Sequence, residues 1–208
     1  MRFTYIPIQA REPAPADGAT EVEPDAVLSW RAGREAVSHD VYFGAGPDGL
    51  SLAASADQVT FTPDALAFGS TYYWRVDEVA DTVWAGDVWS FSTKEYELID
   101  GFETYNDDVD AATTIFDAWL DGWVNDTGST VGYLEAPFAE RTIVRTGKQA
   151  MPLQYDNTAS PFYSETERTF EAAQNWTVHG ADSIVLYVQG VAPAADGTAA
   201  GNAPAPLY

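Results

Sequence analysis

A dense group of carboxylates lies near the middle of the chain, directly after the apolar pair Leu98-Ile99. The group consists of Asp100, Glu103, Asp107, Asp108 and Asp110. Calcium takes roughly six to eight oxygen ligands and often combines carboxylates with backbone carbonyls. The group is therefore a candidate cation site, although no D-x-[DN]-x-[DN]-G run of an EF-hand loop occurs. The alternative is a solvated acidic loop, and the residue types leave both interpretations open.

The sequence contains no recognisable catalytic set. It has no cysteine, two histidines (His39 and His179) and no G-x-S-x-G elbow. Carboxylate pairs of the kind used by glycosidases arise easily by chance among 32 acidic residues. Asp121 and Asp126 form the least implausible pair, and turn formation explains both. We expect His39 to face outward from a predicted strand, and we predict that the chain is not an enzyme.

Composition excludes several classes of partner. The net charge of −22 disfavours nucleic acid and anionic membrane surfaces, and suits solubility, high salt or divalent cations. The lack of cysteine removes disulfides and the usual structural zinc sites. No run of about 18 apolar residues occurs, so we expect no membrane insertion. The first residues alternate like a strand and show no signal-peptide core, which favours an excerpt of a longer precursor.

Aromatic residues are a second kind of candidate site. Tyr and Trp on a sheet face or loop rim can stack on sugar rings, because they combine flat apolar area with a polar group. The alternative is that most of them lie in the core. The predicted carbohydrate-binding set is Trp123, Tyr133, Tyr155, Tyr163 and Trp176. Two N-x-[ST] patterns mark Asn125 and Asn175 as candidate glycosylation sites.

The elements that would position these residues are short strands separated by Gly, Pro and Asp turn signals. This spacing is typical of an all-β sandwich. In the first half of the chain we predict strands over residues 27–30, 38–43, 58–61, 70–79 and 83–93.

The sequences Leu28-Ser29-Trp30 and Leu66…Gly69…Tyr72-Tyr73-Trp74-Arg75-Val76 give residues 12–95 a resemblance to a fibronectin type III domain. A Tyr at such a corner can bond its hydroxyl back to the loop backbone, and Trp30 would fill the core opposite. Domains of this family are spacers or binding modules, so the resemblance implies fold rather than catalysis.

In the second half we predict strands over residues 98–103, 128–135, 149–155, 164–170 and 183–189, with an irregular segment over 105–127. Phe102-Glu103, Gly147–Met151 and Ser183–Val188 resemble the galactose-binding-like jelly rolls that include many carbohydrate-binding modules. The two halves together are similar to sections of large surface proteins of planctomycete-type bacteria. The resemblance implies an extracellular or cell-surface location and a second domain over residues 96–208.

Jelly rolls similar to this one often hold a structural calcium near their first strand. Carried over to this sequence, the resemblance makes Glu103 the central ligand. Asp100 or Asp107 would help, and the carbonyl of Lys148 would be a backbone ligand.

The second domain is short for a jelly roll of about eight strands. Either the fold is abbreviated, or another chain supplies the missing strands at an open edge. The segment at residues 1–11 is a candidate donor arm, with Phe3, Tyr5, Ile6 and Ile8 as assembly residues. We therefore expect two tandem β-sandwiches in an extracellular structural or adhesive module that assembles with copies of itself. The alternative is a carbohydrate-binding module of a larger secreted protein.

Overall fold

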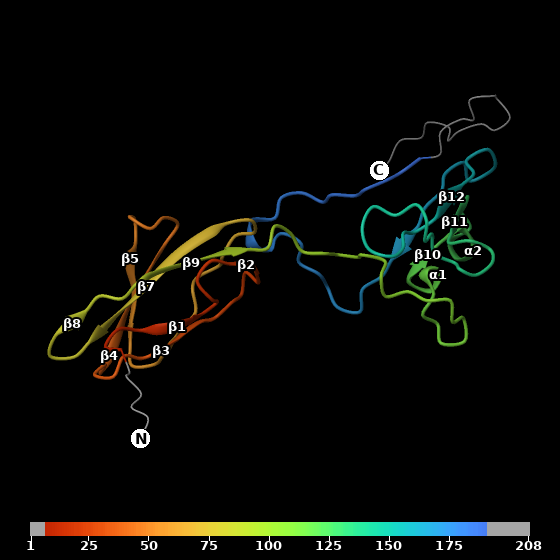
Figure 1. Ribbon diagram of the computed structural model, residues 1–208. Helices are drawn as coiled ribbons and strands as arrows, with labels where there is room; N and C mark the ends of the chain where they lie inside the picture. The colour runs from red at the N-terminus through yellow and green to blue at the C-terminus, as the bar shows by residue number, and fades with distance from the viewer. Residues whose placement is uncertain (1–6, 191–208) are drawn as a thin grey trace, which may run out of the picture. The chain divides into compact units, whose positions relative to one another are not determined.

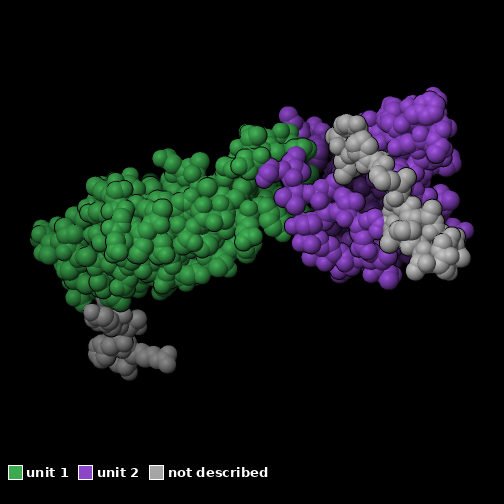
Figure 2. Space-filling model, turned by 90° about the horizontal axis from the view of Figure 1, so that it is seen from above, with its two compact units in different colours: residues 1–99, 174–182 green, residues 100–173, 183–208 purple. Residues whose placement is uncertain are grey.

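The computed structural model describes residues 7–190 and divides the chain into two compact units (Figures 1 and 2). Unit 1 comprises Met1–Ile99 and Gln174–Asp182, and unit 2 comprises Asp100–Ala173 and Ser183–Tyr208. The chain thus passes into unit 2 directly before Asp100. It contributes a late segment, Gln174–Asp182, to unit 1, whereas the sequence analysis assigned that segment to the second domain.

Unit 1 is a β-sandwich made of two sheets (Figure 1). The smaller sheet has the order β1-β3-β6 and the larger one the order β2-β9-β7-β4-β5, with β8 paired to β7. The pairs are antiparallel except for β2 and β9, which run parallel. The strands are β1 (Arg11–Ala14), β2 (Ala19–Val22), β3 (Leu28–Arg31), β4 (Ser38–Gly44), β5 (Ser51–Ala56), β6 (Thr60–Phe61), β7 (Thr71–Val79), β8 (Val83–Trp84) and β9 (Val88–Thr93).

The core of unit 1 lies between the sheets and is built around aromatic residues. Trp74 and Phe91 are almost fully buried, on β7 and β9 respectively. Trp30 from β3 lies edge-on to Trp74 with ring centroids 6.2 Å apart, and Trp89 lies edge-on to Trp74 at 4.8 Å. The predicted core position of Trp30 is confirmed. Edge-to-face pairs of this kind add to the stabilisation from burial itself.

All the strands predicted in the first half are present, and the last of them is divided into β8 and β9. The sequence analysis missed β1, β2 and β5. Strand β1 contains Pro13, which is tolerated because β1 is an edge strand. Strand β5 consists of Ser, Ala and one Leu, residue types that give little strand signal.

Of the predicted N-terminal arm, residues 7–10 belong to unit 1 and form no strand, and Arg11 is the first residue of β1. The Pro7 carbonyl accepts a hydrogen bond from the Arg34 N–H at 3.1 Å, and Gln9 Nε2 donates to the Ala85 carbonyl at 2.7 Å. Ile8 is half-buried between them. The other predicted assembly residues, Phe3, Tyr5 and Ile6, lie outside the described residues.

The segment Gln174–Asp182 contains the short 3-10 helix η1 (Val178–Gly180). His179 holds it on the loop before β7. The Leu66 carbonyl lies 2.9 Å from His179 Nδ1, and the Phe68 N–H donates to the His179 carbonyl at 3.0 Å. The rings of Phe68 and His179 are edge-on at 5.4 Å. These contacts explain why this late segment clusters with unit 1.

Unit 2 has little regular structure. Its elements are α1 (Ile115–Ala118), β10 (Trp119–Leu120), α2 (Gly122–Asn125), β11 (Ser129–Val131), β12 (Leu153–Tyr155) and β13 (Glu167–Arg168). Strand β10 pairs with β13, and β11 pairs with β12. Ile115, Val131 and Ala139 are buried in a small core, and Phe102 and Trp119 are among the residues packed around it.

Two of the strands predicted in the second half are not strands. Residues 98–103 form bends and a turn, and Phe102 has a left-handed backbone with φ of 62°. Residues 183–189 have no regular structure. The described part of unit 2 therefore holds two-stranded ribbons, and the larger sheets of a jelly roll are not seen there.

The helices of the described residues are each about one turn long. None of them has the length and apolar character needed to cross a membrane.

Candidate functional site

Asp100 is the carboxylate around which unit 2 is organised. Its Oδ1 accepts a hydrogen bond from the Phe102 N–H at 2.7 Å. Its Oδ2 accepts from the Tyr105 hydroxyl at 2.6 Å and from Trp119 Nε1 at 2.8 Å. Arg168 of β13 completes the group through an ion pair with the same oxygen. Asp100 thereby joins the start of unit 2 to β10 and β13.

Burial of Tyr105 raises the pKa of its hydroxyl, and the hydrogen bond to Asp100 raises it further. The tyrosine therefore stays neutral and donates to the carboxylate. Sequence reasoning missed Arg168, because its partner lies 68 positions earlier in the chain and no local spacing connects the two residues.

Glu103 binds backbone N–H groups of a distant loop. The Lys148 N–H lies 2.9 and 3.0 Å from the two carboxylate oxygens, and the Gln149 N–H lies 3.3 Å from Oε1. Gly147 precedes them with φ of +76°, and a Cβ there would lie 2.2 Å from Glu103 Oε1. Glycine is favoured at this position, because the backbone is left-handed and a Cβ would displace the Glu103 carboxylate.

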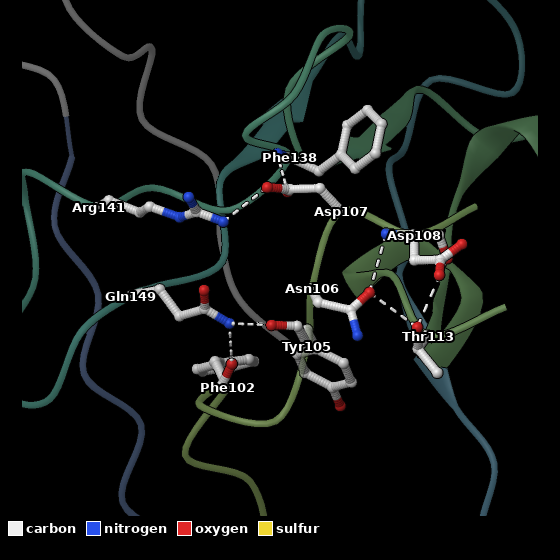
Figure 3. Close-up of polar contacts among 9 residues, drawn as sticks. All are labelled: Phe102, Tyr105, Asn106, Asp107, Asp108, Thr113, Phe138, Arg141 and Gln149. Carbon is white, nitrogen blue, oxygen red and sulfur yellow. Dashed lines mark hydrogen bonds and ion pairs between the residues drawn. The ribbon is translucent and has the colours of Figure 1, made fainter. Parts of the chain in front are cut away.

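The side chain of Gln149 makes a second set of contacts between the loop at residues 147–149 and residues 102–105 (Figure 3). Its Nε2 donates to the Phe102 carbonyl at 2.5 Å and to the Tyr105 carbonyl at 2.9 Å. The side chain is largely buried, so it satisfies two backbone acceptors that water does not readily reach.

Asp107 has protein donors on both oxygens. It accepts from the Phe138 N–H at 2.9 Å and from Arg141 at 2.7 Å (Figure 3). Asn106 organises the neighbouring turn by accepting from the Asp108 N–H and the Thr113 hydroxyl, both at 2.8 Å.

The carboxylates of the acidic segment therefore act separately, as hydrogen-bond acceptors for different parts of the chain. Asp100, Glu103 and Asp107 each bind a different group of protein donors. Within residues 7–190 no three Asp, Glu or His side chains converge in a way that suits a metal ion. A structural calcium held by Glu103, Asp100 or Asp107 and the Lys148 carbonyl stays a prediction.

Asp121 and Asp126, the carboxylates weighed for catalysis, shape the turns around α2. Asp121 precedes the helix and accepts from the Trp123 N–H at 3.0 Å through Oδ1 and from the Val131 N–H at 2.7 Å through Oδ2. Asp126 ends the helix in a left-handed conformation with φ of 58°. These are the roles of an N-cap and a C-cap residue, so the interpretation as turn residues is confirmed.

The predicted carbohydrate-binding aromatics all lie at the surface. The exposed fractions are 79% for Trp123, 38% for Tyr133, 36% for Tyr155, 50% for Tyr163 and 46% for Trp176. Trp176 belongs to unit 1, and the other four aromatics belong to unit 2.

Three of these aromatics come from segments that meet at Gly128-Ser129. The Gly128 N–H donates to the Tyr163 carbonyl at 3.0 Å, and Ser129 pairs with Tyr155 in the β11–β12 ribbon. Trp123 lies on α2, where the preceding Gly122 N–H donates to Ser129 Oγ at 2.9 Å. The tertiary structure thus brings Trp123, Tyr155 and Tyr163 into one region of unit 2.

The Tyr133 hydroxyl donates a hydrogen bond to Glu140. This contact lowers the pKa of the Glu140 carboxyl group. The hydrogen bond from the Tyr133 hydroxyl is the main cause, and the N–H groups of Ile143 and Thr142 add to it; together they lower the pKa of Glu140 to about 2. The same contact raises the pKa of Tyr133.

We expect the Glu140 carboxyl to titrate near pH 2 in the folded protein. Since its pKa in the folded state lies below the usual 4.5, its contribution to stability is present above about pH 4.5 and is lost as the pH falls towards 2. Carboxyl carbon NMR across this range measures the midpoint. Tyr133→Phe should move the midpoint towards 4.5, and an unchanged midpoint in that variant would contradict the assignment.

Both candidate glycosylation sites adopt the same turn. In each, the Asn Oδ1 accepts from the N–H and the hydroxyl of the Thr two positions later, Thr127 for Asn125 and Thr177 for Asn175. Asn175 is exposed, whereas Asn125 is half-buried and donates from Nδ2 to the Glu165 carbonyl at 3.2 Å. Attachment of a glycan at either residue stays a prediction.

His39 faces the core of unit 1, whereas we expected it to face outward. The residue is 4% exposed, and its Nδ1 is hydrogen-bonded with Glu78, which is fully buried. Positions 39, 41 and 43 share one face of β4, and Val41 on that face is in the core, so His39 also faces inward. The second oxygen of Glu78 accepts from the Gly33 N–H at 2.7 Å.

The corner before β7 has the geometry expected for a tyrosine corner. The Ala67 N–H donates to the Tyr72 hydroxyl oxygen at 2.9 Å, as the sequence predicted. Together with the strand order of the two sheets, this corner is a hallmark of sandwiches of the immunoglobulin and fibronectin type III kind.

Comparison with solved structures gives two similarities, both to domains of low sequence identity. The sixth fibronectin type III domain of human fibronectin type III domain containing protein 3 is similar over 48% of this chain and 97% of its own, with 16% identity and a TM-score of 0.37. A structure described as an FN3tt mutant is similar over 42% of this chain and 97% of its own, with 15% identity and a TM-score of 0.31. The strand order of its two sheets and the Tyr72 corner give unit 1 a fibronectin type III-like fold. No protein-family model and no curated protein matches the chain.

Proposed function

We propose that this chain is a non-catalytic structural or adhesive module, located outside the cell or on a bacterial cell surface, that assembles with copies of itself. The observation that supports this proposal is the solvent exposure of the apolar segment Ser183–Gln189, which we call the exposed segment. Its five large apolar residues are all at the surface. Their exposed fractions are 65% for Ile184, 69% for Val185, 66% for Leu186, 63% for Tyr187 and 69% for Val188.

The exposed segment has the composition of a buried strand. All seven of its residues are uncharged, and it contains neither Pro nor Gly. Segments of this type pair readily with other strands when they are exposed. Among the contacts of residues 7–190, none is a hydrogen bond to this segment's backbone. Its Tyr187 ring packs under the Arg145 guanidinium at 3.5 Å.

Charge favours a partner that meets the chain at this segment. The chain carries a net charge of −22, so most of its surface repels a second copy. An uncharged apolar segment allows two copies to approach without that repulsion. The fibronectin type III-like unit adds a further argument, since such sandwiches serve as modules in larger assemblies rather than as catalysts.

We expect Leu186→Glu to abolish self-association. A charge in the middle of the exposed segment would have to be buried without a partner when a strand pairs there. Sedimentation velocity over a range of protein concentrations measures the association. Leu134→Glu is the matched control, because Leu134 is 77% exposed in the same unit. A wild-type chain that stays monomeric at every concentration, or equal effects of the two substitutions, would refute the proposal.

A second candidate function is binding of an uncharged polysaccharide by unit 2. The specific observation is Trp123, which exposes 79% of its surface and lies in the same region as Tyr155 and Tyr163. The acidic chain would repel glycans that carry carboxylate or sulfate groups.

We expect Trp123→Ala to weaken such binding by roughly tenfold, since aromatic stacking contributes about 0.5–1.5 kcal/mol. Retardation in native gels cast with neutral polysaccharides measures it. Trp176→Ala, in unit 1, is the control. No retardation of the wild-type chain by any neutral polysaccharide would reject this function.

A further inference from the structure

The outer edge of β5 is an open pairing edge in unit 1. β5 is the last strand of the order β2-β9-β7-β4-β5 and pairs with β4 alone. Among residues 7–190, no backbone hydrogen bond reaches β5 from its other side. An edge strand in this condition presents a row of unpaired N–H and C=O groups to solvent.

The sequence of β5 offers few of the usual defences against pairing. It reads Ser51-Leu52-Ala53-Ala54-Ser55-Ala56, with no Lys, no other charge and no Pro. Its one irregularity is a bulge. Val41 of β4 pairs with Ala54 and Tyr42 pairs with Leu52, which leaves Ala53 without an opposite residue. The remaining backbone is regular enough to accept a neighbouring strand.

We propose that the exposed segment Ser183–Gln189 of one copy adds as a strand to the β5 edge of a second copy. This inference rests on the proposed self-assembly and names its two surfaces. The partner on β5 is thus another molecule of this chain, and the donor is this segment rather than the N-terminal arm, whose residues 7–9 are bound to unit 1.

The two surfaces complement one another in charge, length and side-chain size. Both are uncharged in a chain with a net charge of −22. The donor has seven residues, and β5 has six. Apart from Leu52, β5 carries only Ser and Ala, which leave room for Ile184, Leu186 and Tyr187 on a neighbouring strand. Large side chains beside small ones are the arrangement that packs well across paired strands.

The pairing joins two different surfaces, so a single contact between two copies leaves one donor segment and one acceptor edge unpaired. Contacts of this head-to-tail kind produce rings or open filaments. The inference therefore predicts oligomers that grow with protein concentration.

The test uses one variant for each surface. Leu186→Glu blocks the donor. Ala53→Pro blocks the acceptor, because proline is tolerated at a bulge but obstructs the outer edge. Leu52→Glu is a second acceptor variant in case Ala53→Pro does not fold, which thermal unfolding detects. Val83→Glu is the control for Leu52→Glu, because it places the same charge at another exposed apolar residue of unit 1.

We expect each blocked variant to be monomeric by sedimentation velocity and light scattering, and Val83→Glu to assemble like the wild type. An equal mixture of donor-blocked and acceptor-blocked chains should form a dimer with twice the mass of the 22.6 kDa chain and nothing larger. If the wild type assembles while both acceptor variants assemble as well, β5 is not the acceptor, although self-assembly stands. A monomeric wild type overturns both proposals.

Discussion

Asp100→Ala is expected to unfold unit 2 while unit 1 stays folded. The substitution removes the acceptor for the Phe102 N–H, the Tyr105 hydroxyl and Trp119 Nε1, and leaves Arg168 without its carboxylate. The Asp100 side chain is 8% exposed, so water replaces few of these contacts. Removing one partner of a fully buried ion pair costs about 3–5 kcal/mol, and the 25% exposure of Arg168 places this pair at or below the low end of that range.

A loss of this size is large for unit 2. Its buried apolar residues are Ile115, Val131 and Ala139, a smaller core than that of unit 1. Domains are typically stable by only about 5–15 kcal/mol, and a unit with a small core lies at the low end. Loss of Asp100 would therefore remove most or all of the free energy of unfolding of unit 2.

Differential scanning calorimetry of the full chain checks this expectation. The wild type should show separate transitions for the two units, and Asp100→Ala should remove one of them. Asp108→Ala is the control, since Asp108 is exposed and its side chain accepts local hydrogen bonds from the N–H groups of Asp110 and Ala111. Asp100→Asn keeps two acceptor lone pairs and should be intermediate. A thermogram for Asp100→Ala that equals that of Asp108→Ala would contradict the central role of Asp100.

The second large effect is expected from Glu78→Ala in unit 1. Glu78 is fully buried, where it pairs with His39 and accepts from the Gly33 N–H. Its removal leaves a cavity, an unsatisfied donor and a buried imidazole without a partner. We expect a loss of about 3–5 kcal/mol in the free energy of unfolding of unit 1.

Urea denaturation followed by tryptophan fluorescence measures this loss, since the cluster of Trp30, Trp74 and Trp89 reports on the core of unit 1. Glu35→Ala serves as the control, because Glu35 pairs with Arg34 at the surface and should contribute less than about 1 kcal/mol. His39→Leu combined with Glu78→Leu should be more stable than Glu78→Ala. The double variant exchanges the pair for apolar side chains, which is often tolerated. Equal stability of Glu78→Ala and Glu35→Ala would show that the buried pair contributes little.

The fold of unit 1 could be predicted because the residue patterns that specify its strands and turns extend over only a few positions of the sequence. Trp30 lies between turn signals on a short apolar strand, and the spacing from Leu66 through Gly69 to Tyr72 specifies a corner whose hydrogen bond spans five positions. Strand β5 gave no such signal, since its small residues form a strand only by pairing with β4. His39 was misplaced because its face of β4 was assigned without the strict period of two.

In unit 2 the residues of the candidate site were visible in the sequence, but their partners were not. The acidic cluster pointed to Asp100, Glu103 and Asp107 and suggested that they converge on a cation. In the structure each carboxylate binds donors from a different part of the chain, and the cation stays a prediction. Arg168 and Gln149 come from positions that no spacing rule connects to residues 100–107.

The sequence by itself determined that this chain is nearly all β and that its first half is a fibronectin type III-like sandwich. Periodicity and turn chemistry act over a few residues, so they can be read without the fold. Only the tertiary structure decided that Asp100 is a hydrogen-bonding centre, that residues 98–103 form turns, and that Ser183–Gln189 lies exposed. These outcomes depend on long-range pairing, where an N–H or C=O group many residues away either reaches a segment or does not.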